Sequence, residues 1–412
     1  MKTIISIDAS LWRKALAQLA PVVNAKQALP ILADVVLKYE QERGLFAMTA
    51  SDGETWVTLD CTDPTGQPWM RMLEDDPKDP FTELALPFAA LKEQVALLPS
   101  AQLLQVTFNG KSMHVNYGIG EFDMMCNESD TFPLPPAVAG KDTEGALCRF
   151  KLDADKLLPM MSAAIESSAD DELRMVMNGV CLDVYNDKVV VAATNGHELF
   201  KDVIDTGIGS GWLDYATFPA FDQDTQKPGS AKLLVTKKAR KALASAVSDG
   251  QLTVTADRQR VEFTAQGVRI VARLIEGNFP NYDAVIPNDS QYRVTIDRDA
   301  LRQALRRVQL SASFDTNMTE LRRDGSAFVV RAANVEFGRS GQERVEITDT
   351  DAFLPDKFHI GLKISTALSI LDRIQTAAVV LILSDPSRPM LYRPDDAHSS
   401  RLILQMPMRC EE

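Results

Sequence analysis

The chain has 412 residues, of which 45% are hydrophobic and 25% charged, and its formal net charge is −13 at pH 7. This length exceeds that of one ordinary domain, and the hydrophobic share suffices for three cores of about 130 to 145 residues each. The composition is typical of a soluble globular protein without a long disordered tail. An acidic body repels duplex DNA, so the net charge alone argues against nucleic-acid binding, but it does not show where the charges lie.

The first residues and the cysteines indicate the compartment. The apolar run that ends at Asp8 is too short for a secretory signal, and no stretch approaches the roughly 20 apolar residues of a membrane span. The cysteines are odd in number and widely scattered, at Cys61, Cys126, Cys148, Cys181 and Cys410. This pattern indicates reduced thiols, so we expect a cytoplasmic protein that does not contact a membrane.

Three similar helix starts suggest an internal repeat. They begin at Ile7, Leu152 and Ile296, an almost constant spacing, and precede helices expected over 11–23, 156–168 and 300–311. The expected N-caps are Ser10, Asp155 and Asp299. Apolar residues at helical spacing correspond in the three copies: Trp12, Ala15, Leu16 and Leu19, then Leu157, Met160, Met161 and Ala164, then Leu301, Ala304, Leu305 and Val308.

Each helix is followed by a segment rich in predicted strands. The expected strands are 31–39, 45–50 and 55–61, then 177–185, 189–193 and 198–204, then 327–332 and 342–348. A second helix is expected over 88–98, 237–247 and 365–375, and the strands that close the repeats over 103–108, 113–117, 252–256, 260–264, 378–383 and 390–393. The segments 60–80 and 206–229 are interpreted as surface loop insertions. We therefore predict an α+β chain of three tandem repeats, each with two helices on antiparallel sheet, in domains 1–145, 146–288 and 289–412.

No motif predicts an enzyme, a metal site or a cofactor. His197-Glu198 begins a zincin-like pattern, but Lys201 stands where the second histidine is required. The glycines between Gly207 and Gly211 lack the lysine and the strand-to-helix context of a nucleotide loop. The four histidines show no metal-ligand spacing.

Basic residues gather on the expected helices, whereas many carboxylates lie in strands and loops. The helix-associated residues are Arg13, Lys14, Lys26, Lys92, Lys237, Lys238, Arg240, Lys241, Arg298, Arg302, Arg306, Arg307, Lys363 and Arg373. The pattern favours a positive face on an acidic body. Ordinary solvated helix faces are the alternative.

Several segments together resemble the bacterial β sliding clamp family, the processivity subunit of DNA polymerase III. The resemblance is carried by the ending Leu404 to Arg409, by Asn178-Gly179 and Ala193 to Leu199, and by Gly277 to Tyr282 with Val285-Ile286-Pro287. Leu29-Pro30-Ile31-Leu32 and the threefold repeat also fit, so the resemblance spans nearly the whole chain.

The resemblance implies a clamp that encircles duplex DNA and tethers the replicative polymerase, with no chemistry of its own. Two chains would join head to tail as a homodimer, and six domains would close a ring with helices lining the hole. DNA would be held by phosphate contacts without sequence information. The implied partners are the DNA polymerase III catalytic subunit, the clamp loader, and other DNA polymerases and repair proteins that carry short peptide motifs.

The resemblance also implies three sets of site residues. The groove for partner peptides would comprise Arg174, Val176, Met177, Thr194, Gly196, His197, Leu199, Pro280, Val285, Leu404, Met406, Pro407, Met408 and Arg409. The residues that face DNA would be Lys26, Lys237, Lys238, Lys363 and Arg302. At the dimer interface, Phe122 and Met124 would pack against Leu310.

This chain departs from the family pattern at several of these places. Ala89 and Ala90 stand where a basic pair is common, so the nearby Lys92 is a substitute candidate for DNA contact in the first domain. Asp171 replaces a neutral polar residue. Glu198 stands where arginine is frequent in the groove, and its negative charge is expected to shift peptide preference. Glu121 stands where a basic residue is common, while Arg339 and Arg344 lie in a region that is usually acidic, which suggests an exchanged ion pair across the interface.

Two other classes of function remain open at the level of the sequence. A three-domain peptide-binding scaffold would keep the groove without binding DNA, and salt-dependent association with DNA would separate it from a clamp. A hydrolase would depend on a single carboxylate or histidine, and the sequence nominates none.

Overall fold

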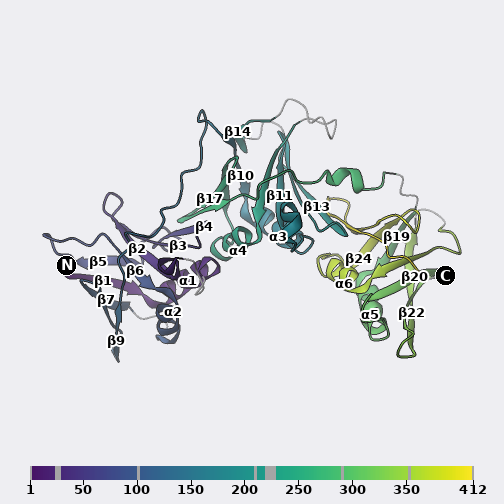
Figure 1. Cartoon of the computed structure of the whole chain (residues 1–412), viewed down its shortest axis with the longest axis horizontal. Coiled ribbons are helices and arrows are strands. Elements are labelled where there is room, and N and C mark those ends of the chain that lie inside the picture. Colours follow the sequence, from purple (N-terminus) through teal and green to yellow (C-terminus); the bar gives the residue numbers. More distant parts are fainter. Residues whose placement is uncertain are drawn as a thin grey trace. The chain divides into compact units, whose positions relative to one another are not determined.

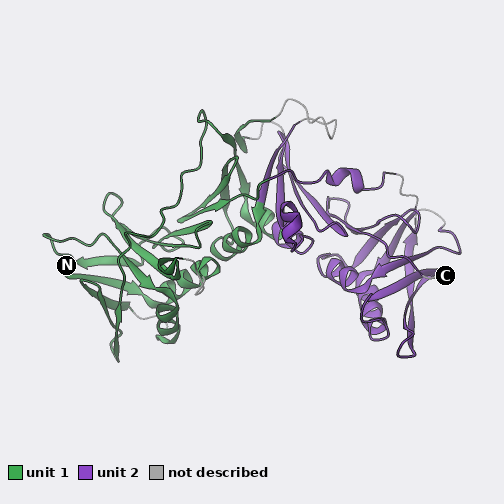
Figure 2. Cartoon of the chain, in the orientation of Figure 1, with its two compact units in different colours: residues 1–159, 208–218, 235–276 green, residues 160–207, 219–234, 277–412 purple. Residues whose placement is uncertain are grey.

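A computed structural model of the chain (Figure 1) describes residues 2–23, 29–99, 103–207, 211–218, 229–288, 292–350 and 354–410. The chain forms two compact units, which Figure 2 colours separately. Unit 1 comprises 1–159, 208–218 and 235–276, and unit 2 comprises 160–207, 219–234 and 277–412. The division into three domains stays a prediction.

Unit 1 contains two sheets. A five-stranded sheet has the order β5 (Met70–Glu74), β1 (Lys2–Asp8), β7 (Leu103–Asn109), β8 (Ser112–Asn116) and β9 (Glu121–Met125). A nine-stranded sheet has the order β14 (Leu213–Ala216), β10 (Ala146–Asp153), β16 (Gln251–Asp257), β17 (Arg260–Ala265), β18 (Val268–Arg273), β4 (Thr55–Asp60), β3 (Leu45–Ser51), β2 (Asp34–Glu40) and β6 (Glu83–Pro87).

Unit 2 is built on one twelve-stranded sheet, which begins with β15 (Ala231–Thr236) at the boundary of the unit. Its further order is β11 (Gly179–Val184), β12 (Lys188–Thr194), β13 (Glu198–Asp205), β26 (Leu402–Gln405), β25 (Met390–Pro394), β24 (Ala378–Leu383), β19 (Tyr292–Asp297), β22 (Arg339–Thr350), β21 (Ala327–Asn334), β20 (Met318–Asp324) and β23 (His359–Lys363). Pairs such as β12 with β13 and β19 with β24 are antiparallel, as predicted.

The strands repeat one local order. β1 lies between β5 and β7, β10 between β14 and β16, and β19 between β22 and β24. The chain then adds β8 and β9, β17 and β18, or β25 and β26. β18 continues by pairing with β4, and β26 continues by pairing with β13. β9 ends its sheet, and among the described strands only β8 pairs with it.

Helices pack in pairs within the units. In unit 1, α1 (Ala9–Leu19) packs against α2 (Phe88–Leu97) and α4 (Lys237–Ala246); in unit 2, α5 (Arg298–Gln309) packs against α6 (Ile364–Asp372). α3 (Ala154–Ile165) crosses the boundary between the units. Short 3₁₀ helices occupy η1 (Ala20–Val22), η2 (Pro30–Ala33), η3 (Glu172–Met177) and η4 (Tyr282–Val285). The predicted apolar faces of α1 and α5 are buried, so the helical periodicity is confirmed.

The predicted N-caps were wrong for two helices. Asp8 caps α1, because its Oδ1 accepts hydrogen bonds from the amides of Ser10 and Leu11 at 2.9 and 3.0 Å. Asp297 caps α5 by accepting from the Ala300 amide at 2.7 Å. A strand runs directly into each helix, which places the earlier carboxylate at the junction, while Ser10 and Asp299 lie inside the first turn. Asp155 likewise lies in the first turn of α3.

The segments predicted to be loop insertions contain strands. β5 lies within 60–80 and pairs with β1, and β14 lies within 206–229 and pairs with β10. β1 and β10 are the first strands of their predicted domains, and each would expose unpaired backbone groups on one edge if β5 or β14 did not pair with it. The prediction also gave no strand at β1, β9, β10, β18, β19, β20 or β26. It began the strand at 177 too early, because η3 precedes β11.

Within the described ranges, no helix is long and apolar enough to cross a membrane.

Thiol reactivity tests the burial of the cysteines. Cys61, Cys126, Cys148 and Cys181 are buried and Cys410 is partly exposed, and burial raises the pKa of the Cys126 and Cys148 thiols to about 12. Because the thiolate is the reactive form, we expect a disulfide reagent at pH 8 to label Cys410 rapidly and the other four only after denaturation. Rapid loss of more than one thiol from the native protein would contradict this packing.

Candidate functional site

The residues expected to form the peptide groove all belong to unit 2. They come from η3, from the turn between β12 and β13, from the segment that contains η4, and from the chain after β25. Leu199 on β13 pairs in register with Leu404 on β26, and the Met406 amide donates to the His197 carbonyl at 2.8 Å. Arg174 reaches the Asn195 carbonyl at 3.5 Å. Segments far apart in the sequence therefore meet here.

The expected groove residues divide into buried and exposed members. Thr194, Leu199 and Leu404 are buried beneath the exposed groove residues. We call the exposed members, Arg174, Gly196, His197, Val285, Met406 and Arg409, the partner surface. Val176, Met177, Pro280, Pro407 and Met408 are half-buried around it. Met408 lies against β23, since its amide donates to the Gly361 carbonyl at 2.8 Å.

The turn between β12 and β13 is held by its own side chains. Asn195 Oδ1 accepts hydrogen bonds from the amides of His197 and Glu198, each at 2.9 Å. Thr194 Oγ1 donates to the Glu198 carbonyl at 2.7 Å and accepts from the Gly196 amide at 3.1 Å. Gly196 has φ +88°, a backbone conformation that favours glycine. The sequence Thr-Asn-Gly therefore fixes where His197 stands.

η3 brings further apolar side chains that sequence reasoning missed. Leu173 is 94% exposed and Met175 is 63% exposed, on either side of Arg174. Asp171 caps η3 by accepting from the Leu173 amide and pairs with Arg174 Nε at 2.9 Å, and these contacts lower the pKa of the Asp171 carboxyl. No predicted element contains Leu173 or Met175, and of this apolar run only Met177 lies in one, as the start of the strand expected over 177–185.

η4 is anchored by polar contacts to the sheet. The Tyr282 hydroxyl donates to Asp183 Oδ2 on β11 at 2.7 Å, and burial raises the pKa of Tyr282. Lys201 on β13 pairs with Asp283 at 2.7 Å and lies 5.4 Å from the centre of the Tyr282 ring. These contacts hold η4 against β11 and β13 and so fix the position of Val285 at its end.

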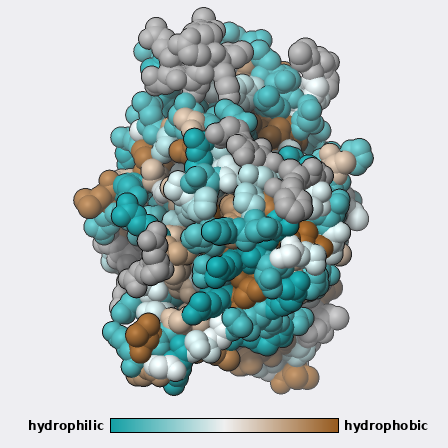
Figure 3. Space-filling view, turned by 90° about the vertical axis from the view of Figure 1, so that its right-hand side faces the viewer, coloured by the Kyte–Doolittle hydropathy of each residue, from teal (hydrophilic) through white to brown (hydrophobic). Residues whose placement is uncertain are grey.

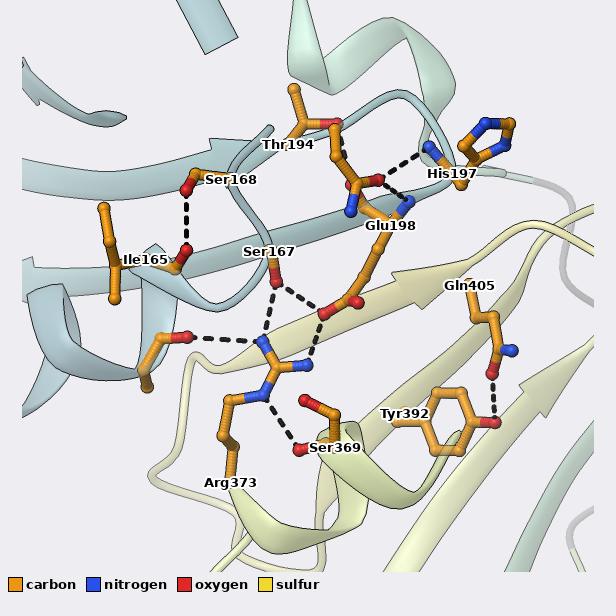
Figure 4. A network of polar contacts seen from close by, with 12 residues as sticks. Ile165, Ser167, Ser168, Thr194, His197, Glu198, Ser369, Arg373, Tyr392 and Gln405 are labelled. Atoms are coloured by element: carbon orange, nitrogen blue, oxygen red, sulfur yellow. Dashed lines mark hydrogen bonds and ion pairs between the residues drawn. The ribbon is translucent and has the colours of Figure 1, made fainter. Parts of the chain in front are cut away.

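The expectation for Glu198 was wrong. Its side chain is 6% exposed and forms an ion pair with Arg373, which is 8% exposed (Figure 4). The carboxylate therefore does not add negative charge to the partner surface. Its pairing with a residue 175 positions away has no local sequence signal.

The residues expected to face DNA lie in different settings. Lys26 lies outside the described residues. Lys237 and Lys238 begin α4, and Lys238 pairs at 2.6 Å with Asp52, whose side chain is only 3% exposed. Lys363 is exposed at the junction of β23 and α6. Arg302 pairs with Asp372 at 2.6 Å.

Three arginines assigned to the positive face have internal roles instead. Arg13 donates to the Leu98 carbonyl at 2.6 Å at the end of α2, and Arg298 donates to the Ile374 carbonyl at 2.6 Å just after α6. Arg373 is buried. Guanidinium groups satisfy the free carbonyls at helix C-termini, so spacing along a helix does not reveal which cations remain at the surface. Lys92 is exposed and lies 5.8 Å from the centre of the Phe88 ring.

The expected interface residues lie at open places in both units. Phe122 and Met124 are half-buried on β9, and Leu310 is 78% exposed after α5. Exposed Phe314 and Phe337 form an edge-to-face pair with ring centres 5.8 Å apart, and Arg339 lies 5.9 Å from the centre of the Phe337 ring. In the part of the chain that the structure describes, no three His, Cys, Asp or Glu side chains are grouped to hold a metal ion.

Comparison with known proteins gives consistent matches. Residues 283–409 match the family model "DNA polymerase III beta subunit, C-terminal domain". The chain is 24% identical to the beta sliding clamp of Pseudomonas aeruginosa over 398 residues, 96% of this chain and 97% of that protein. It is 24% identical to the beta sliding clamp of Caulobacter vibrioides over 417 aligned positions, 98% of this chain and 99% of that protein.

Solved structures show the same fold. A sliding clamp from Pseudomonas aeruginosa bound to griselimycin has a TM-score of 0.81 at 23% identity, with 100% of both chains covered. The DNA polymerase III beta subunit of Thermotoga maritima has a TM-score of 0.81 at 20% identity, with 99% of this chain and 100% of that chain covered.

Gly277 offers a test of the packing behind the partner surface. It has φ +119°, and an added Cβ would lie 2.6 Å from Val176 Cγ1 on η3. We expect Gly277→Ala to lower the free energy of unfolding by at least about 2 kcal/mol, because backbone strain and overpacking combine. Gly338→Ala is the matched control, since Gly338 has φ +57° with no atom within 4 Å of the added Cβ, and it should cost about 1 kcal/mol. Equal losses in urea unfolding would show that 277 does not pack on η3.

Proposed function

We propose that this chain, which belongs to the bacterial β sliding clamp family, encircles duplex DNA and tethers the replicative polymerase and other DNA-processing proteins to it. The clamp confers processivity and catalyses no reaction. The observation that carries the proposal is the repeated strand exchange in the two large sheets. β18 pairs with β4 and β26 pairs with β13, so the last strand of one predicted domain extends the sheet of the domain before it.

This pattern leaves one donor strand and one acceptor edge unused. β9 is the last strand of the first predicted domain and has only β8 beside it among the described strands. In the third predicted domain, within the residues that the structure describes, Arg339 to Glu346 of β22 pair with β21 alone, and the later residues also reach β19. Exposed edges of this kind are templates for pairing with another chain. β9 of one chain would pair with β22 of a second.

Two such contacts close a head-to-tail homodimer of six domains, with domains 1–145, 146–288 and 289–412 in each chain. Each contact joins different surfaces, which allows a ring when the rotation closes. Phe122 and Met124 would pack against Leu310, next to the exposed Phe314 and Phe337. Figure 3 shows that hydrophobic side chains on this end of unit 2 lie between hydrophilic ones. Glu121 would approach Arg339 and Arg344.

The hole would be lined by helices, with the DNA-facing residues Lys237, Lys238 and Arg302 on them and Lys363 directly before α6. The fifth expected DNA-facing residue, Lys26, lies outside the described residues. Contacts to phosphates hold DNA without reading its sequence, which suits a sliding ring. Lys238 pairs with Asp52 and Arg302 pairs with Asp372, and these ion pairs weaken the electrostatic attraction of both cations to phosphates. The net charge of −13 keeps DNA away from the rest of the body.

The partner surface would take short peptide motifs of the DNA polymerase III catalytic subunit, the clamp loader, and other polymerases and repair proteins. Met406 and Val285 supply adaptable apolar contacts, and Arg174 and His197 supply polar ones at the edge. Griselimycin, which the Pseudomonas aeruginosa relative binds, is a practical probe of this surface. A protein with these properties would act in the cytoplasm, where the DNA is.

The dimer contact predicts a difference between neighbouring residues of β9. Met124 and Phe122 pair in register with buried Met113 and Val115 of β8, so all four side chains lie on one face of the sheet. Met125 lies on the other face and is 66% exposed. Met124→Asp should raise the dimer dissociation constant at least about tenfold, because it places a charge in an apolar contact. Met125→Asp should change it little. Sedimentation that shows equal dimers for both variants would remove β9 from the interface.

The ring predicts a topological form of DNA binding. Loaded by its clamp loader, the protein should stay on nicked circular plasmid in a spin column and be lost when the plasmid is linearised, because it slides off the ends. Lys363→Glu should lower retention at moderate salt, since it removes a phosphate contact. Equal retention on both forms of DNA would contradict encirclement, and no association at any salt would favour a peptide-binding scaffold.

The partner surface predicts that one exposed side chain controls ligand affinity. Met406→Asp should weaken griselimycin binding at least about tenfold in calorimetry, because a carboxylate replaces an apolar contact. Met125→Asp is the matched control in the other unit and should bind like the unaltered protein. Unchanged binding by Met406→Asp would place the ligand elsewhere.

A further inference from the structure

A buried ion pair between Arg373 and Glu198 lies next to the turn that carries His197 of the partner surface (Figure 4). Arg373 follows α6, and its Nη2 donates to Glu198 Oε1 at the start of β13. Its Nη1 donates to Ser167 Oγ at 2.7 Å and to the Ala163 carbonyl at 3.2 Å, and its Nε donates to the Ser369 carbonyl at 3.0 Å. Ser167 Oγ in turn lies 2.5 Å from Glu198 Oε1. Each of the three guanidinium nitrogens thus donates at least one hydrogen bond.

Burial of such a pair is not explained by stability alone. Desolvation of two charges can cost as much as their attraction returns, and apolar residues of similar volume often replace a buried pair without loss of stability. Removal of one partner is harmful, because an uncompensated charge then remains in the interior. The value of the pair therefore lies in what it fixes in place.

What it fixes is the turn that carries His197. The Glu198 amide shares Asn195 Oδ1 with the His197 amide, and the Glu198 carbonyl accepts from Thr194 Oγ1. On the next strand, Glu198 pairs in register with Gln405, which precedes Met406. A displacement of Glu198 would move both His197 and Met406.

The same elements hold the other end of α6. Gln405 Nε2 donates to the Lys363 carbonyl at 2.9 Å, and Gln405 Oε1 accepts from the buried Tyr392 hydroxyl at 2.7 Å. Lys363 precedes α6 and Arg373 follows it. Residues adjacent to the partner surface therefore bind α6 at both of its ends.

We propose that Glu198 and Arg373 are a positioning pair for the partner surface, which sets the place of His197 and Met406 relative to α6. This inference rests on the proposed function, because it assigns the pair a role in binding of partner peptides. The pair acts through geometry, since its charges are internally neutralised and shielded from the ligand. A sliding clamp with this arrangement carries its peptide site and its DNA-facing helix on one braced assembly of unit 2.

The test separates position from packing. Glu198→Leu combined with Arg373→Met replaces the pair by apolar groups, and the full chain should lose less melting temperature than with Glu198→Ala alone, while binding griselimycin about tenfold more weakly. The single change Glu198→Ala should lower both stability and affinity. Asp257→Ala is the control, because Asp257 is buried in unit 1, where it accepts hydrogen bonds from the Gln259 and Arg260 amides at 2.7 Å each. It should lower stability without changing affinity.

A second readout covers variants that fold poorly. Ser167→Ala removes one bridge of the network and keeps both charges, and it should speed hydrogen exchange at the His197 and Glu198 amides by about tenfold relative to the rest of β13. Wild-type affinity of the apolar double variant, or unchanged exchange in Ser167→Ala, would overturn the positioning role. Failure of the unaltered chain to bind griselimycin, or binding that Met406→Asp leaves intact, would instead contradict the proposed partner surface.

Discussion

The pairing of edge strands between successive parts of the chain is the constraint on which the rest of the structure depends. An antiparallel sheet that ends in an exposed strand presents unpaired N–H and C=O groups. Within unit 1 this edge is covered where β18 meets β4, and within unit 2 where β26 meets β13. Among the described strands, β9 and the first half of β22 are paired on one side only, and we propose that these edges meet a second chain. In the proposed ring, these two edges pair with those of the second chain.

Many basic side chains are likewise paired within the chain. Carboxylates outnumber basic residues, and many of the basic groups on helices are already engaged. Arg13 and Arg298 satisfy carbonyls at helix ends, Lys238 pairs with Asp52, and Arg373 is buried with Glu198. Each engaged cation attracts a phosphate less strongly, because its charge is already partly neutralised. A ring that encloses DNA topologically does not need strong contacts, and weak ones permit sliding.

The sequence predicted those features that depend on local periodicity. The apolar faces of α1 and α5, the paired helices and most strand positions are as expected, because they follow from spacing along a few turns or residues. The N-caps Asp8 and Asp297 were missed by two residues, since the strand before each helix determines which carboxylate stands at the junction. β5 and β14 were missed because their strand character depends on β1 and β10, which are distant in the sequence. Glu198 was misassigned to the surface for the same reason, as only the fold brings Arg373 to it.

Imaging of the purified protein by negative-stain electron microscopy tests the central claim most directly. At concentrations where the chain is a dimer, the account predicts a six-lobed closed ring with a hole wide enough for duplex DNA. Met124→Asp should abolish these rings and Met125→Asp should preserve them, because only the first residue lies in the proposed contact. Compact or elongated dimers without a hole would contradict encirclement of DNA.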